Sequence, residues 1–133
     1  GKEIAKFAST GGNLPEEKKA LLKTLEDVQA MIGHMVGVAM ESQENPKEIY
    51  KVGLNTSRLL MATGDLIIAW LLLRQADIAQ SKLATAGKDT EFYNGKIASA
   101  KFFIRSVLPH ISVERAVVES ETGEIMNIAE SAF

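Results

Sequence analysis

Apolar residues recur at helical spacing through the first third of the chain. Between residues 13 and 41 they are separated by four, three, four, three and four positions, which places them on one side of an α-helix and does not fit the two-residue period of a β-strand. Asn13 precedes them as a candidate N-cap, Pro15 stands in the first turn, and Glu16 lies three residues after the cap. The pattern predicts a helix that begins after Asn13 and ends in the polar segment 41–44, with the apolar positions Leu21, Leu25, Val28, Ile32, Met35 and Ala39.

A second and much longer helix is predicted from the segment 45–48, Asn-Pro-Lys-Glu, which supplies a capping Asn and a proline at the first helical position. No further proline occurs before Pro109, and the apolar residues keep their helical spacing as far as Leu83. An unbroken helix over 46–85 would be about 60 Å long, whereas a compact domain of this size is about 45 Å across. Gly64 is the expected weak point, and both a bend there and a continuous helix fit its cost of about 1 kcal/mol relative to alanine.

Two further helices are predicted in the last third of the chain. Gly87 is suited to end the long helix and Asp89 to cap the next one, which Pro109 is expected to stop. Ser112 is then a candidate cap for a shorter helix over 113–120. The apolar positions of the third helix follow a four-three-four-three spacing: Tyr93, Ile97, Ala100, Ile104 and Val107.

These elements together predict an all-α fold, an antiparallel helical bundle with short loops and one very long helix. Residues 1–8 read as the end of a preceding helix, and the segment 9–12, Ser-Thr-Gly-Gly, reads as a flexible break. We therefore predict a linker from a preceding domain over 1–12 and the bundle domain over 13–133. Gly1 is not an initiator methionine, so we expect the chain to be a piece of a longer protein.

Composition narrows the function classes. The 133 residues are 46% hydrophobic and contain no cysteine, which excludes a disordered chain, a disulfide framework, a thiolate zinc site and a cysteine nucleophile. The net charge is −2 and the charges are interspersed, which argues against a nucleic-acid partner. The apolar run Leu66–Leu73 covers about 12 Å, too little for about 30 Å of hydrocarbon. We predict no transmembrane segment and a cytoplasmic location.

The chain shows no pattern of catalytic or metal-binding residues. The Glu-x-x-His spacing of di-iron bundles is absent, because neither His34 nor His110 has a carboxylate three residues before it. Asp65 interrupts an apolar stretch, and its charge would need a cation or a hydrogen-bond donor if it were buried. We interpret Asp65 as structural, with a catalytic role as the alternative. No nucleophile or second base accompanies it, so we predict no catalytic, cofactor-binding or metal-binding residue.

Two groups of residues are candidates for contact with another domain or subunit. Trp70 and Arg74 are four residues apart, on one side of the long helix, and such residues often anchor interfaces. Lys96, Lys101 and Arg105 follow at spacings of five and four along the third helix. These three residues form either a solvated surface or a docking surface for acidic groups or for a phosphate-bearing ligand such as coenzyme A.

Several segments resemble a known family. The resemblance covers residues 45–109, and its most specific part is Phe-Tyr-x-x-Lys-Ile-Ala-x-Ala over 92–100. The chain resembles the extra C-terminal helical domain of long bacterial acyl-CoA dehydrogenases, a subgroup that includes methylmercaptopropionyl-CoA dehydrogenase. The segment 126–133 is also similar to such a C-terminus. The segments that carry the resemblance are Gly64-Asp65, residues 70–76 (Trp-Leu-Leu-Leu-Arg-Gln-Ala), residues 92–103 and Leu108-Pro109.

The resemblance implies a parent flavoprotein that binds FAD, removes an α-proton from an acyl-CoA thioester with a carboxylate base, and passes the β-hydride to the flavin to give 2-enoyl-CoA. In that family the base, the flavin pocket and the acyl channel belong to the preceding domains, and no residue here matches them. The chain is thus expected to be a non-catalytic accessory domain that packs on the catalytic domains of the parent chain or mediates homo-oligomerisation. The alternative is a free-standing helical module for protein–protein interaction.

Overall fold

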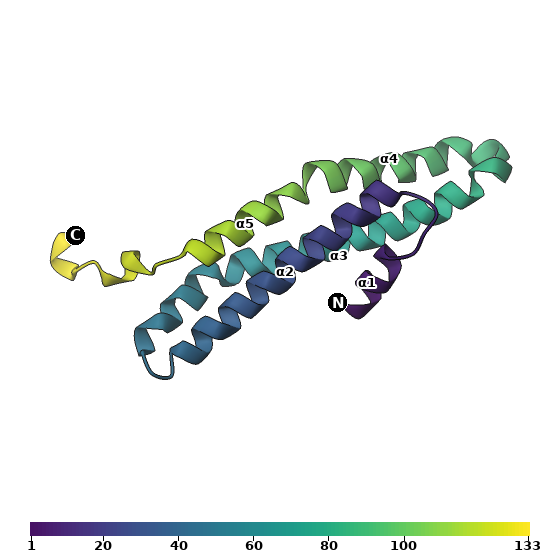
Figure 1. Cartoon of the computed structure of the whole chain (residues 1–133). Coiled ribbons are helices and arrows are strands. Elements are labelled where there is room, and N and C mark those ends of the chain that lie inside the picture. Colours follow the sequence, from purple (N-terminus) through teal and green to yellow (C-terminus); the bar gives the residue numbers. More distant parts are fainter.

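The computed structural model describes all 133 residues, and its regular elements are helices only. α2 and α3 run antiparallel along the length of the molecule, α4 turns back beside α3, and α5 extends α4 toward the end at which α2 and α3 are joined (Figure 1). The predicted all-α helical bundle is therefore confirmed. The α-helices are α1 (Lys2–Ala8), α2 (Pro15–Glu41), α3 (Ile49–Lys82), α4 (Thr90–Ser106) and α5 (Pro109–Ser120).

The long helix α3 continues through Gly64 without interruption. It contains 34 residues, which corresponds to a length of about 51 Å, and one 3-10 turn adjoins each end, Pro46–Glu48 and Leu83–Thr85. The neighbouring Ala62 and Leu66 are both buried, and packing of this kind offsets the cost of one glycine of about 1 kcal/mol. The helix therefore keeps its hydrogen bonding through Gly64 and does not break there.

The beginning of α2 differs from the predicted capping box. Leu14, not Asn13, is the residue before the helix, and it adopts a left-handed conformation with φ of 56° and ψ of 50°. Asn13 instead reaches across to α3, where its Nδ2 donates to Ser81 Oγ at 2.9 Å and to the Asp77 carbonyl oxygen at 3.3 Å. The Asn13 side chain therefore ties the start of α2 to α3 and leaves the first amides of its own helix uncapped.

The boundary between α4 and α5 also differs from the prediction. Pro109 is the first residue of α5, and only Val107 and Leu108 separate the two helices. Proline fits a first helical position because that amide has no partner within the helix. Ser112 therefore lies inside α5, and its hydroxyl donates to the Asp27 side chain of α2. The prediction that Ser112 caps a helix over 113–120 is wrong.

One hydrophobic core runs along the molecule. α3 supplies small residues to it, including Ala69 and Ala76, which are fully buried and allow the neighbouring helices to approach closely. α1 contributes Ile4 and Ala8 to the same core. Residues 2–8 are thus a helix packed on the bundle, while their role as part of a linker over 1–12 stays a prediction.

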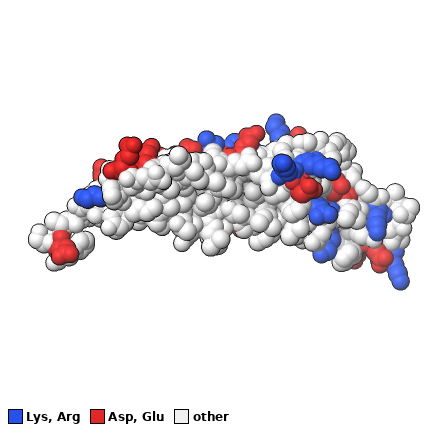
Figure 2. Space-filling model, turned by 90° about the horizontal axis from the view of Figure 1, so that it is seen from below, with Lys and Arg blue, Asp and Glu red and all other residues white.

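α3 exposes much apolar surface. With its flanking turns, residues Pro46–Thr85, it is long and apolar enough to cross a membrane, with a mean hydropathy of 1.4 over its most apolar 18-residue window. The run Leu66–Leu73 is therefore only the middle of a longer apolar segment, although one such helix is weak evidence for a membrane span. Only 22% of the window is buried. Figure 2 shows a broad surface without charged side chains along the middle of the molecule.

Candidate functional site

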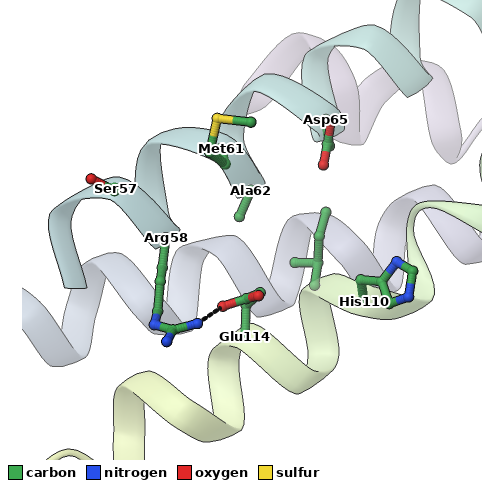
Figure 3. Close-up of a pocket in the computed structure, with 8 residues that line it drawn as sticks. Ser57, Arg58, Met61, Ala62, Asp65, His110 and Glu114 are labelled. Atoms are coloured by element: carbon green, nitrogen blue, oxygen red, sulfur yellow. Dashed lines mark hydrogen bonds and ion pairs between the residues drawn. The ribbon is translucent and has the colours of Figure 1, made fainter. Parts of the chain in front are cut away.

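A pocket between α3 and α5 brings together several ionisable side chains (Figure 3). It has a volume of about 290 Å³ and is lined by residues of both helices. The Arg58 guanidinium donates to Glu114 Oε2 at 2.6 Å across one end of the pocket. Asp65 of α3 and His110 of α5 lie toward the other end. Asp65 is half-buried and lines this pocket, so its charge is not enclosed in the core.

The ionisable groups of this pocket differ in whether they are already paired. Arg58 neutralises Glu114, which leaves Asp65 and His110 as the groups that a ligand or partner could contact. Ser57, the one hydroxyl residue of the lining, lies at the opposite end from His110 in Figure 3, so the two do not form a nucleophile–base pair. The pocket therefore offers hydrogen-bonding groups but no nucleophile–base pair.

A buried carboxylate, which the sequence analysis missed, joins α2 to α5. Asp27 is 2% exposed and accepts hydrogen bonds from Lys23 Nζ at 2.6 Å, Ser112 Oγ at 2.6 Å and Arg115 Nη1 at 3.1 Å. Burial raises the pKa of Asp27, but the hydrogen bonds from the three donors outweigh this effect and hold that pKa below its ordinary value. Hydrogen bonds to Glu119 and Asp27 raise the pKa of Arg115. The cluster is fully paired, which indicates a structural role.

The predicted interface pair Trp70 and Arg74 lies beside α1. The Arg74 guanidinium carbon is 5.3 Å from the centroid of the Trp70 ring, as their spacing of four residues suggested. Both residues line a groove of about 460 Å³ with four residues of α1 and the following turn: Glu3, Lys6, Phe7 and Thr10. The Trp70 indole N–H is buried without an acceptor. Trp70 and Arg74 are therefore next to a segment of this same chain, and their contact with another domain stays a prediction.

The three basic residues of α4 point to different neighbours. Lys96 donates to Gln75 Oε1 on α3 at 3.1 Å, whereas Arg105 lies 3.8 Å from Glu17 Oε1 on α2. Lys101 is half-buried between them along the helix. The structure thus places Lys96 and Arg105 toward opposite neighbours, and neither side chain is free of partners. Their role as a docking surface stays a prediction.

The ionisable side chains of this chain do not gather into a metal-binding cluster. No group of three or more His, Cys, Asp and Glu residues is placed to hold a metal ion. Of the basic groups that line the two grooves described above, Arg58 is paired with Glu114 and Lys6 shares its groove with Glu3, whereas Arg74 stacks on Trp70 without an acidic partner.

Comparison with known proteins gives consistent matches. The family described as "Acetyl-CoA dehydrogenase C-terminal like" matches residues 1–129. The chain is 41% identical to the broad-specificity linear acyl-CoA dehydrogenase FadE5 of Mycobacterium tuberculosis over 98% of this chain. It is 37% identical over 62% of its length to a butyryl-CoA dehydrogenase of Syntrophomonas wolfei. The chain spans only 22% and 14% of the lengths of these two relatives.

Proposed function

The chain belongs to the family of acyl-CoA dehydrogenase C-terminal-like domains, and we propose that it is the non-catalytic accessory domain of a longer FAD-dependent acyl-CoA dehydrogenase. In this proposal it packs on the catalytic domains of the same chain. The observation that carries the proposal is the match of nearly the whole chain to about a fifth of a single dehydrogenase. The remainder of such a protein would hold the flavin and the acyl-CoA.

The exposed apolar surface of α3 supports this role. Leu60, Met61, Ile67, Ile68 and Leu71 are each more than two-fifths exposed on one helix. Monomeric soluble proteins rarely expose contiguous apolar patches of more than a few hundred Å², and larger ones mark interaction sites. A helix buried on one side and apolar on the other is the element expected at a domain–domain contact.

For the parent protein we propose oxidation of a straight-chain acyl-CoA to the 2-enoyl-CoA. This substrate class follows the relatives, whose names state linear acyl-CoA and butyryl-CoA. The likeness of residues 92–103 to methylmercaptopropionyl-CoA dehydrogenases makes a thioether acyl-CoA the second candidate. Rates of the longer protein with butyryl-CoA and with methylmercaptopropionyl-CoA, measured with the same electron acceptor, distinguish the two.

We also propose that the parent is a cytoplasmic homo-oligomer. Sedimentation analysis tests the oligomeric state, and cell fractionation tests the location.

The alternative function is a free-standing interaction module, for which the exposed side of α3 would be equally suitable. The reading frame upstream of Gly1 distinguishes them. Several hundred in-frame residues with a dehydrogenase core support the accessory domain, whereas a start codon close to Gly1 supports the free module.

The proposed function is tested by measuring which part of the longer protein carries the flavin and the acyl-CoA oxidation activity. The 133-residue chain, the longer protein, and the longer protein cut before Gly1 are each purified and examined for flavin absorbance and acyl-CoA oxidation. We expect both signals in the longer protein and neither in the isolated chain. Flavin or acyl-CoA oxidation in the isolated chain would contradict a non-catalytic role, and their absence from the longer protein would contradict the parent activity.

A further inference from the structure

α1 covers part of one side of the α2–α3 pair. The ring of Phe7, near the end of α1, lies 5.2 Å from Lys18 Nζ on α2. At the other end of α1, a Cβ placed on Gly1 would lie 3.3 Å from Gln29 Nε2. α1 therefore runs along α2 from the level of Gln29 to the level of Lys18, and on α3 it adjoins Arg74.

The same side of α2 continues past α1 as uncovered apolar surface. Lys18, Gln29 and Val36 are separated by eleven and seven residues, close to three and two helical turns, so they share one side of α2. Val36 is 54% exposed, and its neighbours along this side, Ile32 and Met40, are 43% and 65% exposed. These three side chains are therefore largely exposed in this chain, whereas α1 lies over the preceding turns of α2.

α3 shows the same continuation. Arg74, Ile67 and Leu60 follow one another at intervals of seven residues, so the side that α1 adjoins at Arg74 extends to Ile67 and Leu60, which are 42% and 69% exposed. The ion pair between Lys18 and Asp77 fixes the antiparallel register, which brings Leu60 level with about residue 35 of α2 and Ile67 level with about residue 28, at the N-terminal end of α1. We call these uncovered residues the open strip: Ile32, Val36, Met40, Leu60 and Ile67.

We propose that the segment immediately before Gly1 in the longer chain lies along the open strip and covers it. This inference rests on the proposed function, because it requires a chain that precedes Gly1. Traced from its C-terminal end to its N-terminal end, α1 runs from the level of Lys18 to the level of Gln29. A segment that precedes Gly1 and keeps this direction would therefore reach the open strip. The open strip is continuous with the surface that α1 covers. The matching family is described as C-terminal, and the relatives are several times longer than this chain.

The packing of α1 is a further reason. Its residues Ile4 and Ala8 are buried in the core, so α1 is held on the bundle next to the open strip. A segment that continues from α1 and packs on the apolar side chains of the strip would extend this packing. The open strip contains no charged residue, so its occupant is expected to present an apolar side. A second copy of the chain and a lipid surface are the competing occupants.

These 133 residues contain no cysteine, so a single cysteine introduced on the open strip can be labelled specifically. Val36→Cys places one thiol on the strip, and Val113→Cys places a control thiol on α5, where the residue is 60% exposed. Maleimide labelling of each thiol is followed by peptide mass spectrometry in the isolated chain and in the lipid-free longer protein. We expect Val36→Cys to react at least tenfold more slowly in the longer protein, and Val113→Cys to change by less than twofold. Equal labelling of Val36→Cys in both proteins would overturn the proposal.

Photocrosslinking identifies what covers the strip. A benzophenone maleimide attached to Val36→Cys in the longer protein should form its adduct within about 20 residues before Gly1, since a helical segment of that length spans about 30 Å. An adduct to another domain or to another copy of the chain would overturn the proposal. Protection of Val36→Cys that is lost on dilution, or that appears only when lipid vesicles are added, would overturn it too.

A third thiol separates this proposal from the proposed function. Met61→Cys lies on a different side of α3, facing the pocket between α3 and α5, at a residue that is 66% exposed. If Met61→Cys is protected in the longer protein and Val36→Cys is not, the domain packs on its parent by another surface; the proposed function stands and the strip proposal fails. If neither thiol is protected, both fail.

Discussion

Replacing Asp27 by Asn tests whether the buried carboxylate cluster holds α5 on the bundle. The carboxylate is 2% exposed and accepts three hydrogen bonds from two helices. Removing one partner of a fully buried ion pair costs about 3–5 kcal/mol. Lys23 and Arg115 are 58% and 36% exposed, so water can solvate them once Asp27 is neutral. We therefore expect a smaller loss in the free energy of unfolding, of about 2–3 kcal/mol.

Glu114→Gln is the matched control, because it removes the other side-chain ion pair that joins α5 to the bundle. Arg58 and Glu114 are 42% and 36% exposed, and exposed pairs contribute about 0–1 kcal/mol. Urea unfolding of both variants, followed by circular dichroism, gives the two losses under the same conditions. Equal losses for Asp27→Asn and Glu114→Gln, or a loss below about 1 kcal/mol for Asp27→Asn, would refute the reasoning.

The same variant gives a pH signature. The folded pKa of Asp27 is lowered, so its stabilisation is fully present above the unfolded value of about 3.9 and is lost as the pH falls through the folded pKa. The difference in unfolding free energy between the parent sequence and Asp27→Asn should be constant near neutral pH and shrink below about pH 4. A difference that persists undiminished at the lowest pH at which the chain folds, or grows on acidification, would contradict the assigned shift.

Two further predictions concern α3 and its neighbours, and both are measured by urea unfolding of the 133-residue chain. Leu73 is fully buried and Leu71 is 44% exposed, so Leu73→Ala should cost about 2–5 kcal/mol and Leu71→Ala less than about 1; equal losses would contradict the assigned faces of α3. A Cβ on Gly64 would meet open space within a helix, whereas Gly87 has φ of 53°. Gly64→Ala should therefore stabilise the chain by about 0.5–1 kcal/mol and Gly87→Ala should destabilise it, and the opposite order would contradict the backbone assignment.

The helical elements could be predicted from sequence because their apolar residues repeat at a clear period. The 4-3-4-3-4 spacing of α2 and the segment 45–48 locate two long helices correctly. The element ends were harder to predict. Asn13 and Ser112 have the side chains of N-caps, yet each hydrogen-bonds to a distant helix, at Ser81 and Asp27. Local propensity cannot reveal such a choice, since the competing partner is more than 65 residues away in sequence.

The candidate sites were less predictable than the helices. Asp27 sits two residues after Leu25 and directly before Val28, beside the apolar stripe of α2, and this position is the one sequence signal that a buried charge was present. Its partners on α5 depend on how that helix packs. Trp70 and Arg74 were predicted as interface residues from their type and spacing, but in the structure they line a groove with α1 of the same chain. Whether a surface residue meets its own chain or another is decided by tertiary packing, which a helical period does not specify.

Association in trans tests the central claim most directly. The longer protein is cut before Gly1, the two pieces are purified separately, and the 133-residue chain is titrated into the remaining piece by calorimetry. An accessory domain that packs on its own catalytic core should bind with one-to-one stoichiometry, and a Val36→Glu variant should bind more weakly because it places a charge in the open strip. Absence of any binding between the two folded pieces, in a longer protein that is itself active, would contradict the account.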